Sequence, residues 1–429
     1  MQHVDHEQLD FLTAAMPPEV WTMAAELAAI DRLLADPAIL APLLANLDPV
    51  RGRPSVPAAQ VLRLLYLKER YQLSDRDLIQ EVSDSFHWRQ FCHFGVADAL
   101  PHPSTLTYWR RRLGPEGILA INRAVTARLQ ADKVIRGRRF RIDSTVTEAN
   151  IHHPTDSGLL GDAIRRMTRR ARRLHTIIKE APVPVRDRAR SVKRRILEIG
   201  KVLKRRTGEA VAEVRRITEE LARIGVAQGR AVARLIDGAK EQIAVLDQAA
   251  AHRVAQVEEA LQDLQTVIRQ SRAATAGERI PVRMVSVADP DARPIKKGKL
   301  GKPVQFGYKV QIMEAENGFV TDYSVSTGNP PDADALGPAL DRHRAQFGRD
   351  PDIVAPDRGY DSARIAAERK PAFRRAQRWR AGGEGTINRL KRKYGLRRSR
   401  YRGYDAVATG IGLGIFAHNV RRWAQRQAS

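Results

Sequence analysis

Two runs of alternating apolar and polar residues flank an Asn-Gly pair, and they constrain the fold more than any other feature. Residues 304–312 place Val, Phe, Tyr, Val and Ile at every second position, and residues 319–325 repeat the alternation. Such alternation predicts β-strands, and Asn317-Gly318 between the runs predicts a tight hairpin. The chain must therefore contain a sheet, although most of its remaining periodicity is helical.

Two further strands are predicted outside this hairpin. A strand over residues 138–146 would point Phe140 and Ile142 to one face and Arg139, Arg141 and Asp143 to the other. Residues 353–355 form a short apolar strand, and a helix is predicted between it and the hairpin, over residues 334–347. Asp332 and Asp334 follow two prolines and are expected to cap that helix.

The first 135 residues have a helical pattern. Residues 58–70 carry apolar side chains at helical spacing, Ser74 offers a cap for a second helix, and a third begins at Ser104. The third helix is basic and includes Arg110 and Arg111, which favours a DNA-binding unit of the helix-turn-helix kind. An ordinary helical bundle with a solvated arginine run is the alternative.

A long helical segment separates the first predicted strand from the hairpin. Apolar residues recur at intervals of three and four over residues 214–224 and 254–268, as in antiparallel hairpins or coiled coils. Gly225, Gly229 and Gly238 are expected to interrupt its helices. Packing or self-association without chemistry is the preferred interpretation of this segment.

These patterns predict an α/β protein in which a mixed sheet, closed by a terminal helix, is divided by an insertion. The expected domains are an all-α N-terminal domain over residues 1–135, a domain that contains the sheet over residues 136–160 and 277–429, and a coiled-coil-like helical insertion over residues 161–276.

The charge of the chain indicates a polyanionic partner. Its 429 residues have a formal net charge of +25, and residues 364–402 hold 15 Lys and Arg against two acids. Nucleic acid is the commonest partner of so basic a protein. The single cysteine, Cys92, excludes an internal disulfide framework, and no apolar run is long enough to span a membrane.

Three acids are candidates for a metal site. Asp143 lies on the polar side of its strand, Asp357 follows the strand at 353–355, and Glu384 is one of the two acids in the basic segment. Carboxylates at neighbouring strand ends can share divalent ions that assist phosphoryl transfer, and Mg²⁺ prefers such oxygen ligands. A turn or capping role is the alternative for each Asp, and charge balance for Glu384.

The spacing of residues around Glu384 resembles a known signature. Arg380, Glu384 and Lys391 match the Arg, Glu and Lys of the Tyr-x2-Arg-x3-Glu-x6-Lys pattern of bacterial insertion-sequence DDE transposases, whereas Gln377 stands at the Tyr position. Other segments resemble the same family in the same order, and the similarity covers nearly all of the chain except the helical insertion. They are residues 73–78, 102–106, 140–145, 355–361, 387–398 and 417–420.

The resemblance implies an RNase H-like catalytic domain that holds two Mg²⁺ ions, with Mn²⁺ as an alternative. It implies hydrolysis at the terminal inverted repeats of a transposon and attack of the freed 3′-hydroxyl on target DNA. Asp143, Asp357 and Glu384 would be the catalytic metal ligands. Contacts to DNA are expected from six basic residues: Arg110, Arg111, Arg358, Arg380, Arg389 and Lys391. A cytoplasmic, nucleoid-associated homo-oligomer is expected, a dimer that joins two DNA ends, with no membrane partner.

One departure leaves an alternative open. Only 26 residues separate Asp357 from Glu384, where relatives place another strand and a loop. Three glycines, at positions 382, 383 and 385, are also expected to weaken the start of the helix that carries Glu384. The alternative is therefore a catalytically impaired, DNA-binding remnant of such an enzyme.

Overall fold

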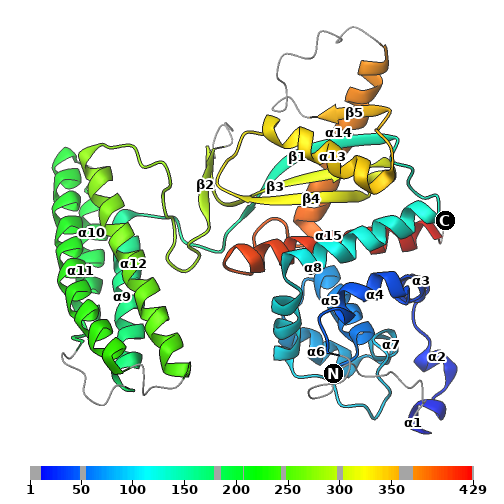
Figure 1. Ribbon diagram of the computed structural model, residues 1–429, viewed down its shortest axis with the longest axis horizontal. Helices are drawn as coiled ribbons and strands as arrows, with labels where there is room; N and C mark the ends of the chain where they lie inside the picture. The colour runs from blue at the N-terminus through cyan, green and yellow to red at the C-terminus, as the bar shows by residue number, and fades with distance from the viewer. Residues whose placement is uncertain are drawn as a thin grey trace. The chain divides into compact units, whose positions relative to one another are not determined.

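The computed structural model describes residues 11–48, 55–177, 185–205, 207–242, 248–296, 303–356 and 371–427. The chain divides into two compact units (Figure 1). The sheet unit comprises Met1–Asn150 and Ile295–Ser429, and the helical unit comprises Ile151–Pro294. The further division of the sheet unit into an N-terminal domain and a catalytic domain stays a prediction.

The sheet is mixed, and the predicted α/β class is confirmed. The described strands are β1 (Arg139–Glu148), β2 (Arg293–Lys296), β3 (Val304–Glu314), β4 (Val320–Thr327) and β5 (Ile353–Pro356). Central strand β1 is antiparallel to β3 on one side and parallel to β5 on the other. β4 pairs antiparallel with β3, and β2 is also a neighbour of β3.

The predicted hairpin is confirmed. Asn317 and Gly318 have φ values of 64° and 74°, and they connect β3 to β4. A positive φ at both positions is what an Asn-Gly hairpin turn requires. The turn therefore sets the register in which β3 and β4 present their side chains.

The two faces of the sheet have different covers. Phe140, Ile142 and Met313 pack with Ala339 of α13 (Leu336–Phe347) on one face. Because side chains alternate along a strand, Arg141 and Asp143 belong to the opposite face, as predicted. That face meets α14 (Pro371–Lys393), which contacts β1 and β5.

Helix α15 (Tyr404–Gln427) is buried on nearly all sides. It contacts α3, α5, α8 and β4, and Figure 1 shows it beside α8 below the sheet. Asn419 pairs its side-chain amide with the backbone of Val320 in β4, donating at 2.7 Å and accepting at 3.0 Å. One apolar helix thus connects the N-terminal helices to the sheet.

The N-terminal segment is helical as predicted. Its helices are α1 (Phe11–Ala14), α2 (Pro18–Trp21), α3 (Ala25–Leu34), α4 (Pro37–Leu44), α5 (Ala58–Tyr71), α6 (Asp75–Asp84), α7 (Phe86–Phe91) and α8 (Pro103–Ala131). Ser74 caps α6 by accepting from the Asp77 backbone N–H at 3.1 Å. Gly114 adopts a φ of 59° inside α8, where the helix changes direction before Pro115.

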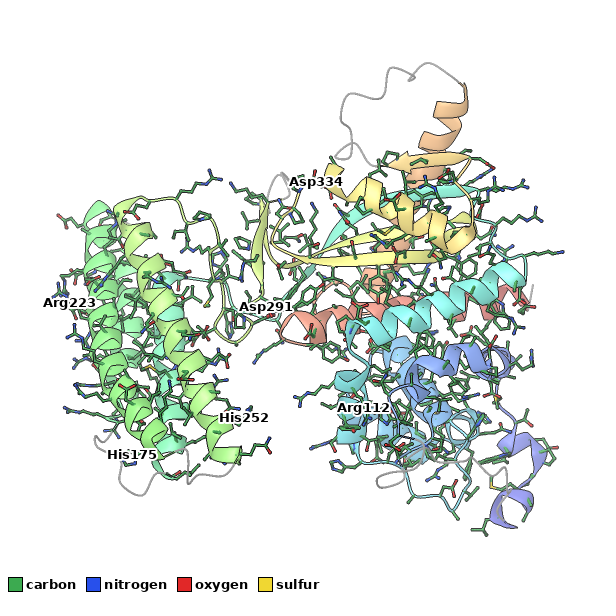
Figure 2. All side chains as sticks on the ribbon, viewed as in Figure 1. Arg112, His175, Arg223, His252, Asp291 and Asp334 are labelled. Carbon is green, nitrogen blue, oxygen red and sulfur yellow. The ribbon has the colours of Figure 1, made fainter. Side chains whose placement is uncertain are left out.

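In the described residues of the helical unit, four helices share an apolar core: α9 (Asp156–His175), α10 (Ala189–Leu203), α11 (Gly208–Gln242) and α12 (Gln248–Ala276). The expectation that glycines interrupt these helices is wrong, because α11 runs through Gly225, Gly229 and Gly238. A Cβ at Gly225 would lie 3.2 Å from Ile268, and one at Gly229 would lie 3.2 Å from Leu261. These glycines let α12 approach α11 closely. In Figure 2, Arg223 and His252 mark exposed positions on this unit.

Candidate active site

Asp143 lies on β1, which pairs with β3 on one side and with β5 on the other. It is half-buried, and its Oδ1 accepts a hydrogen bond from the Ser144 backbone N–H at 2.6 Å. In the parallel pairing with β5, the last described partners are Ile142 and Pro356. Asp357 and Arg358 come directly after Pro356 in the sequence and lie outside the described residues.

Glu384 is an exposed residue of α14. The buried side of this helix carries Gly383, Thr386 and Leu390, at intervals of three and four. At about 100° per residue, Lys391 lies within about 20° of Glu384 on the helix, and its side chain is half-buried. The predicted pairing of an acid and a cation on one side of the helix therefore fits the observed α14.

A buried ion pair ties α14 to the sheet. Arg141 pairs with Glu314, its cross-strand neighbour on β3, and the two side chains are only 8% and 3% exposed. The guanidinium also donates to the Trp379 carbonyl oxygen in α14 and lies 4.8 Å from the centre of the Trp379 ring. Burial raises the pKa of Glu314, and the positive charge of Arg141 opposes that rise. Strand periodicity predicted only the side of the strand on which Arg141 lies, and nothing in the sequence pattern indicated this pair.

The glycines near Glu384 have a structural reason. A Cβ at Gly382 would lie 3.0 Å from Nη1 of Arg141, and one at Gly383 would lie 3.2 Å from its Nε. These positions let α14 pass close over the arginine, and the helix continues without interruption from Pro371 to Lys393. The expected weak helix start at these glycines is therefore wrong. Because Arg141 and Asp143 share a face, α14 crosses the face of the sheet on which Asp143 lies.

The described residues supply two of the three predicted carboxylates. Within the described ranges, no group of three or more His, Cys, Asp or Glu side chains is placed to hold a metal ion. The second acid of the predicted trio, Asp357, is outside those ranges. Asp143 and Glu384 both have some solvent access, and their donors are the carboxylate oxygens that Mg²⁺ prefers. These residue types fit a magnesium ion, and the trio itself stays a prediction.

Asp332 has a different role from the helix cap that was expected. Its side chain makes no capping hydrogen bond to the short helix that follows. Instead, Asp332 Oδ1 lies 2.9 Å from Nζ of the buried Lys309, and Oδ2 accepts from the Ser144 hydroxyl at 3.3 Å. The ammonium of Lys309 attracts this carboxylate more strongly than the backbone N–H groups of a short turn. Asp332 thereby holds the side chain of Ser144, the residue after Asp143, on the opposite face of the sheet.

The predicted DNA-contacting residues lie in different surroundings. The Arg110 guanidinium makes two hydrogen bonds with Asp75, at 2.8 and 2.7 Å, and its side chain is 11% exposed. Arg111 and Arg389 are exposed, whereas the side chain of Arg380 is not described. A structural role suits Arg110 better, and the exposed arginines remain candidates for phosphate contacts.

Comparisons with known proteins show that two parts of the chain are similar to transposase domains. A family model described as a transposase domain (DUF772) matches residues 20–112, and one described as a transposase DDE domain matches residues 357–424. The first covers most of the N-terminal helices, and the second includes both Asp357 and Glu384. Together they confirm the resemblance to insertion-sequence DDE transposases that the motifs indicated.

One relative is similar over part of the chain. The uncharacterized protein ORF8 in the nfe locus of Rhizobium meliloti is 34% identical over 127 residues, which are 28% of this chain and 61% of that protein. No solved structure matches the chain. In the part of the chain that the structure describes, no helix combines the length and apolar character needed to cross a membrane.

Proposed function

We propose that this protein is a metal-dependent DNA transposase, which cuts at the ends of a transposon and joins them to target DNA. The observation that carries the proposal is the position of Asp143. It lies on the central strand, on the face that α14 crosses, and α14 carries Glu384. The proposal requires Asp357, the residue after β5, to come within bridging reach of Asp143. An RNase H-like catalytic domain is compatible with the observed mixed sheet.

The proposed chemistry is two phosphoryl transfers. In the first, a water oxygen attacks the phosphorus at the transposon end, the water loses a proton, and the 3′-oxygen released by the broken P–O bond takes up a proton to become a hydroxyl. In the second, that hydroxyl oxygen loses its proton as it attacks a target phosphodiester, and the displaced target 3′-oxygen takes up a proton. Two Mg²⁺ ions, when bound, would stabilise the attacking and leaving oxygens of each in-line displacement. Asp143, Asp357 and Glu384 would hold them, while Arg380 and Lys391 would bind DNA phosphates.

The remaining parts of the chain have supporting roles in this proposal. The N-terminal helices, with the exposed Arg111 and Arg112 of α8, would bind the terminal repeats (Figure 2). The helical unit would provide packing or self-association. A homodimer would hold two DNA ends for joining. The matched DDE segment runs from residue 357 to residue 424 through the short spacing before Glu384, so no observation favours an impaired remnant.

The test is a cleavage and strand-transfer assay on DNA that carries the inverted repeats flanking the gene. We expect product with Mg²⁺ and none with EDTA. Asp143→Asn should abolish cleavage without preventing DNA binding, because a neutral amide keeps the shape of the side chain but loses the charge that binds metal. Asp334→Asn, at an exposed acid, is the matched control and should retain activity. Full activity of Asp143→Asn would refute the assignment, and inactivity of the wild-type chain on its own repeats would favour the remnant.

A further inference from the structure

A polar cavity of about 280 Å³ lies between the end of α14 and α15 in the sheet unit. We call it the α14–α15 pocket. Four of its lining residues are permanent cations, two from each helix. The lining residues are Arg389, Lys393, Tyr394, His418, Arg421, Arg422 and Gln425.

The positive charge of the α14–α15 pocket is only partly compensated. Arg421 pairs with Glu26 of α3 at 3.0 Å, and Arg422 donates from Nε to the neutral carbonyl oxygen of Asn317. Arg389 and Lys393 are exposed, and neither pairs with a carboxylate among the residues that the structure describes. Among the described residues, a carboxylate therefore pairs directly with only one of these four cations.

The surroundings of Arg422 show the same excess. Burial lowers its pKa, and the nearby charge of Arg389 lowers it further, whereas Glu314 acts in the opposite direction. Glu314 is already paired with Arg141. Cations held close together in a partly buried site repel one another unless an anion joins them. The pocket thus favours a negatively charged occupant.

Two of the lining residues, Tyr394 and His418, are buried aromatic side chains that pack against each other. The rings of Tyr394 and His418 meet nearly at right angles, with centroids 5.4 Å apart. Burial lowers the pKa of His418 to about 4, and its Nε2 lies 3.1 Å from the Gly318 carbonyl oxygen, so the neutral ring donates this hydrogen bond. The lining of the pocket therefore combines four cations with a neutral histidine.

We propose that the α14–α15 pocket binds a phosphate group of the DNA backbone. This inference rests on the proposed function and adds a contact to it. Arginine offers planar, forked donors that match phosphate oxygens, and lysine adds a point charge. The pocket has three arginines and one lysine, and its volume accommodates a phosphate group with water.

The bound phosphate is not the one that reacts. At about 100° per residue, Arg389 and Lys393 lie about 140° and 180° around α14 from Glu384. The pocket and the catalytic acid are therefore on opposite flanks of this helix. A DNA segment that crosses α14 would be anchored on one flank while its scissile bond is on the other.

The test is the salt dependence of DNA binding. The double variant Arg389→Gln/Lys393→Gln is compared with Arg215→Gln/Arg253→Gln, which removes the same charge from exposed positions of α11 and α12 in the helical unit. Binding to a short duplex is measured in EDTA over a range of salt concentrations. Loss of one phosphate contact should reduce the slope of log Kobs against log salt by about 0.9 and weaken binding. The control variant should keep the wild-type slope.

A second variant and a second probe make the result decisive. Gln425→Glu places a carboxylate in the pocket and should also reduce the slope. Unchanged slopes in both pocket variants, or an equal fall in the control, would overturn the proposal. Inorganic phosphate, added at constant ionic strength, identifies the source of the anion. Thermal stabilisation by phosphate that the pocket variants lose, together with an unchanged DNA slope, would assign the pocket to a free anion and overturn DNA binding there.

These measurements do not depend on catalysis. In EDTA no metal-dependent cleavage occurs, and the same series can be repeated with Asp143→Asn. If the chain never cuts DNA but the pocket variants still lose slope, the anchoring contact stands while the proposed enzymatic function fails. If cleavage is found and the slope is unchanged, the proposed enzymatic function stands while the anchoring contact fails.

Discussion

Replacing Arg141 with Met tests whether the buried ion pair holds α14 on the sheet. The side chain is 8% exposed and its partner, Glu314, is 3% exposed, so the substitution leaves a carboxylate without its ion-pair partner away from water. Removing one partner of a buried pair costs about 3–5 kcal/mol. Methionine keeps most of the length of the arginine stem, so lost packing contributes little.

The expected loss is large enough to measure directly. At about 2 °C per kcal/mol for a domain of this size, the Tm of the sheet unit should fall by about 6–10 °C at pH 8. Circular dichroism or scanning calorimetry on the full chain would record the change. The double variant Arg141→Met/Glu314→Gln should recover much of the stability, because the uncompensated charge is then gone.

The pH dependence gives an independent check on the same residues. Burial raises the pKa of Glu314, and removing Arg141 should raise it further. A carboxyl with a raised folded-state pKa contributes its stability fully below its unfolded value of about 4.3 and loses it as pH rises through the folded value. The single variant should therefore be less destabilised at pH 5 than at pH 8. The reasoning would be wrong if Arg141→Met had a Tm within 1 °C of wild type at pH 8 while Glu314 was still ionised. The cost of about 3–5 kcal/mol for an unpaired buried carboxylate would then be absent.

Four further substitutions test the packing of α15 and the helical unit. Asn419→Ala removes two buried hydrogen bonds to β4 and should cost about 2–4 kcal/mol in urea denaturation; a cost under about 1 kcal/mol would contradict this. Gly414→Ala would place a Cβ against the Tyr394 carbonyl oxygen and should lower the free energy of unfolding by about 1–3 kcal/mol. Gly200 in α10 has open space around it, so Gly200→Ala should raise the free energy of unfolding by about 0.5–1 kcal/mol. Burial lowers the pKa of His418 to about 4, so the neutral side chain contributes its full share of the folding stability above pH 6.5. Roughly 3 kcal/mol should then be lost as pH falls to 4, and His418→Phe should remove that loss.

Much of the local structure could be predicted because neighbouring residues determine it. Alternation placed β1, β3 and β4, and the Asn317-Gly318 pair placed the turn, because both depend on backbone preferences over a few residues. The short strand β2 was not predicted. The same local reasoning failed at Gly225 and Gly229. Helix propensity considers the backbone alone, whereas these glycines are retained inside α11 because another helix packs against them.

In the candidate site, too, features set by neighbouring residues were predicted, whereas contacts between residues distant in the chain were not. The sequence placed Asp143 on the polar side of its strand and Glu384 with Lys391 on one side of a helix, since each placement needs only the period of its own element. It assigned Asp332 to a cap because the competing ammonium of Lys309 is distant in the chain. Local periodicity cannot show which charges meet across the fold.

The sequence by itself determined four of the five described strands, the hairpin turn, the order of the elements and the excess of positive charge, because these follow from residues close together in the chain. Only the tertiary structure decided that Arg141 would be buried against Glu314, 173 positions away, and that Arg389 and Arg422 would share one pocket. The physical reason is that pairing and repulsion between charges depend on distance in space. That distance is set when α14 and α15 pack against the sheet.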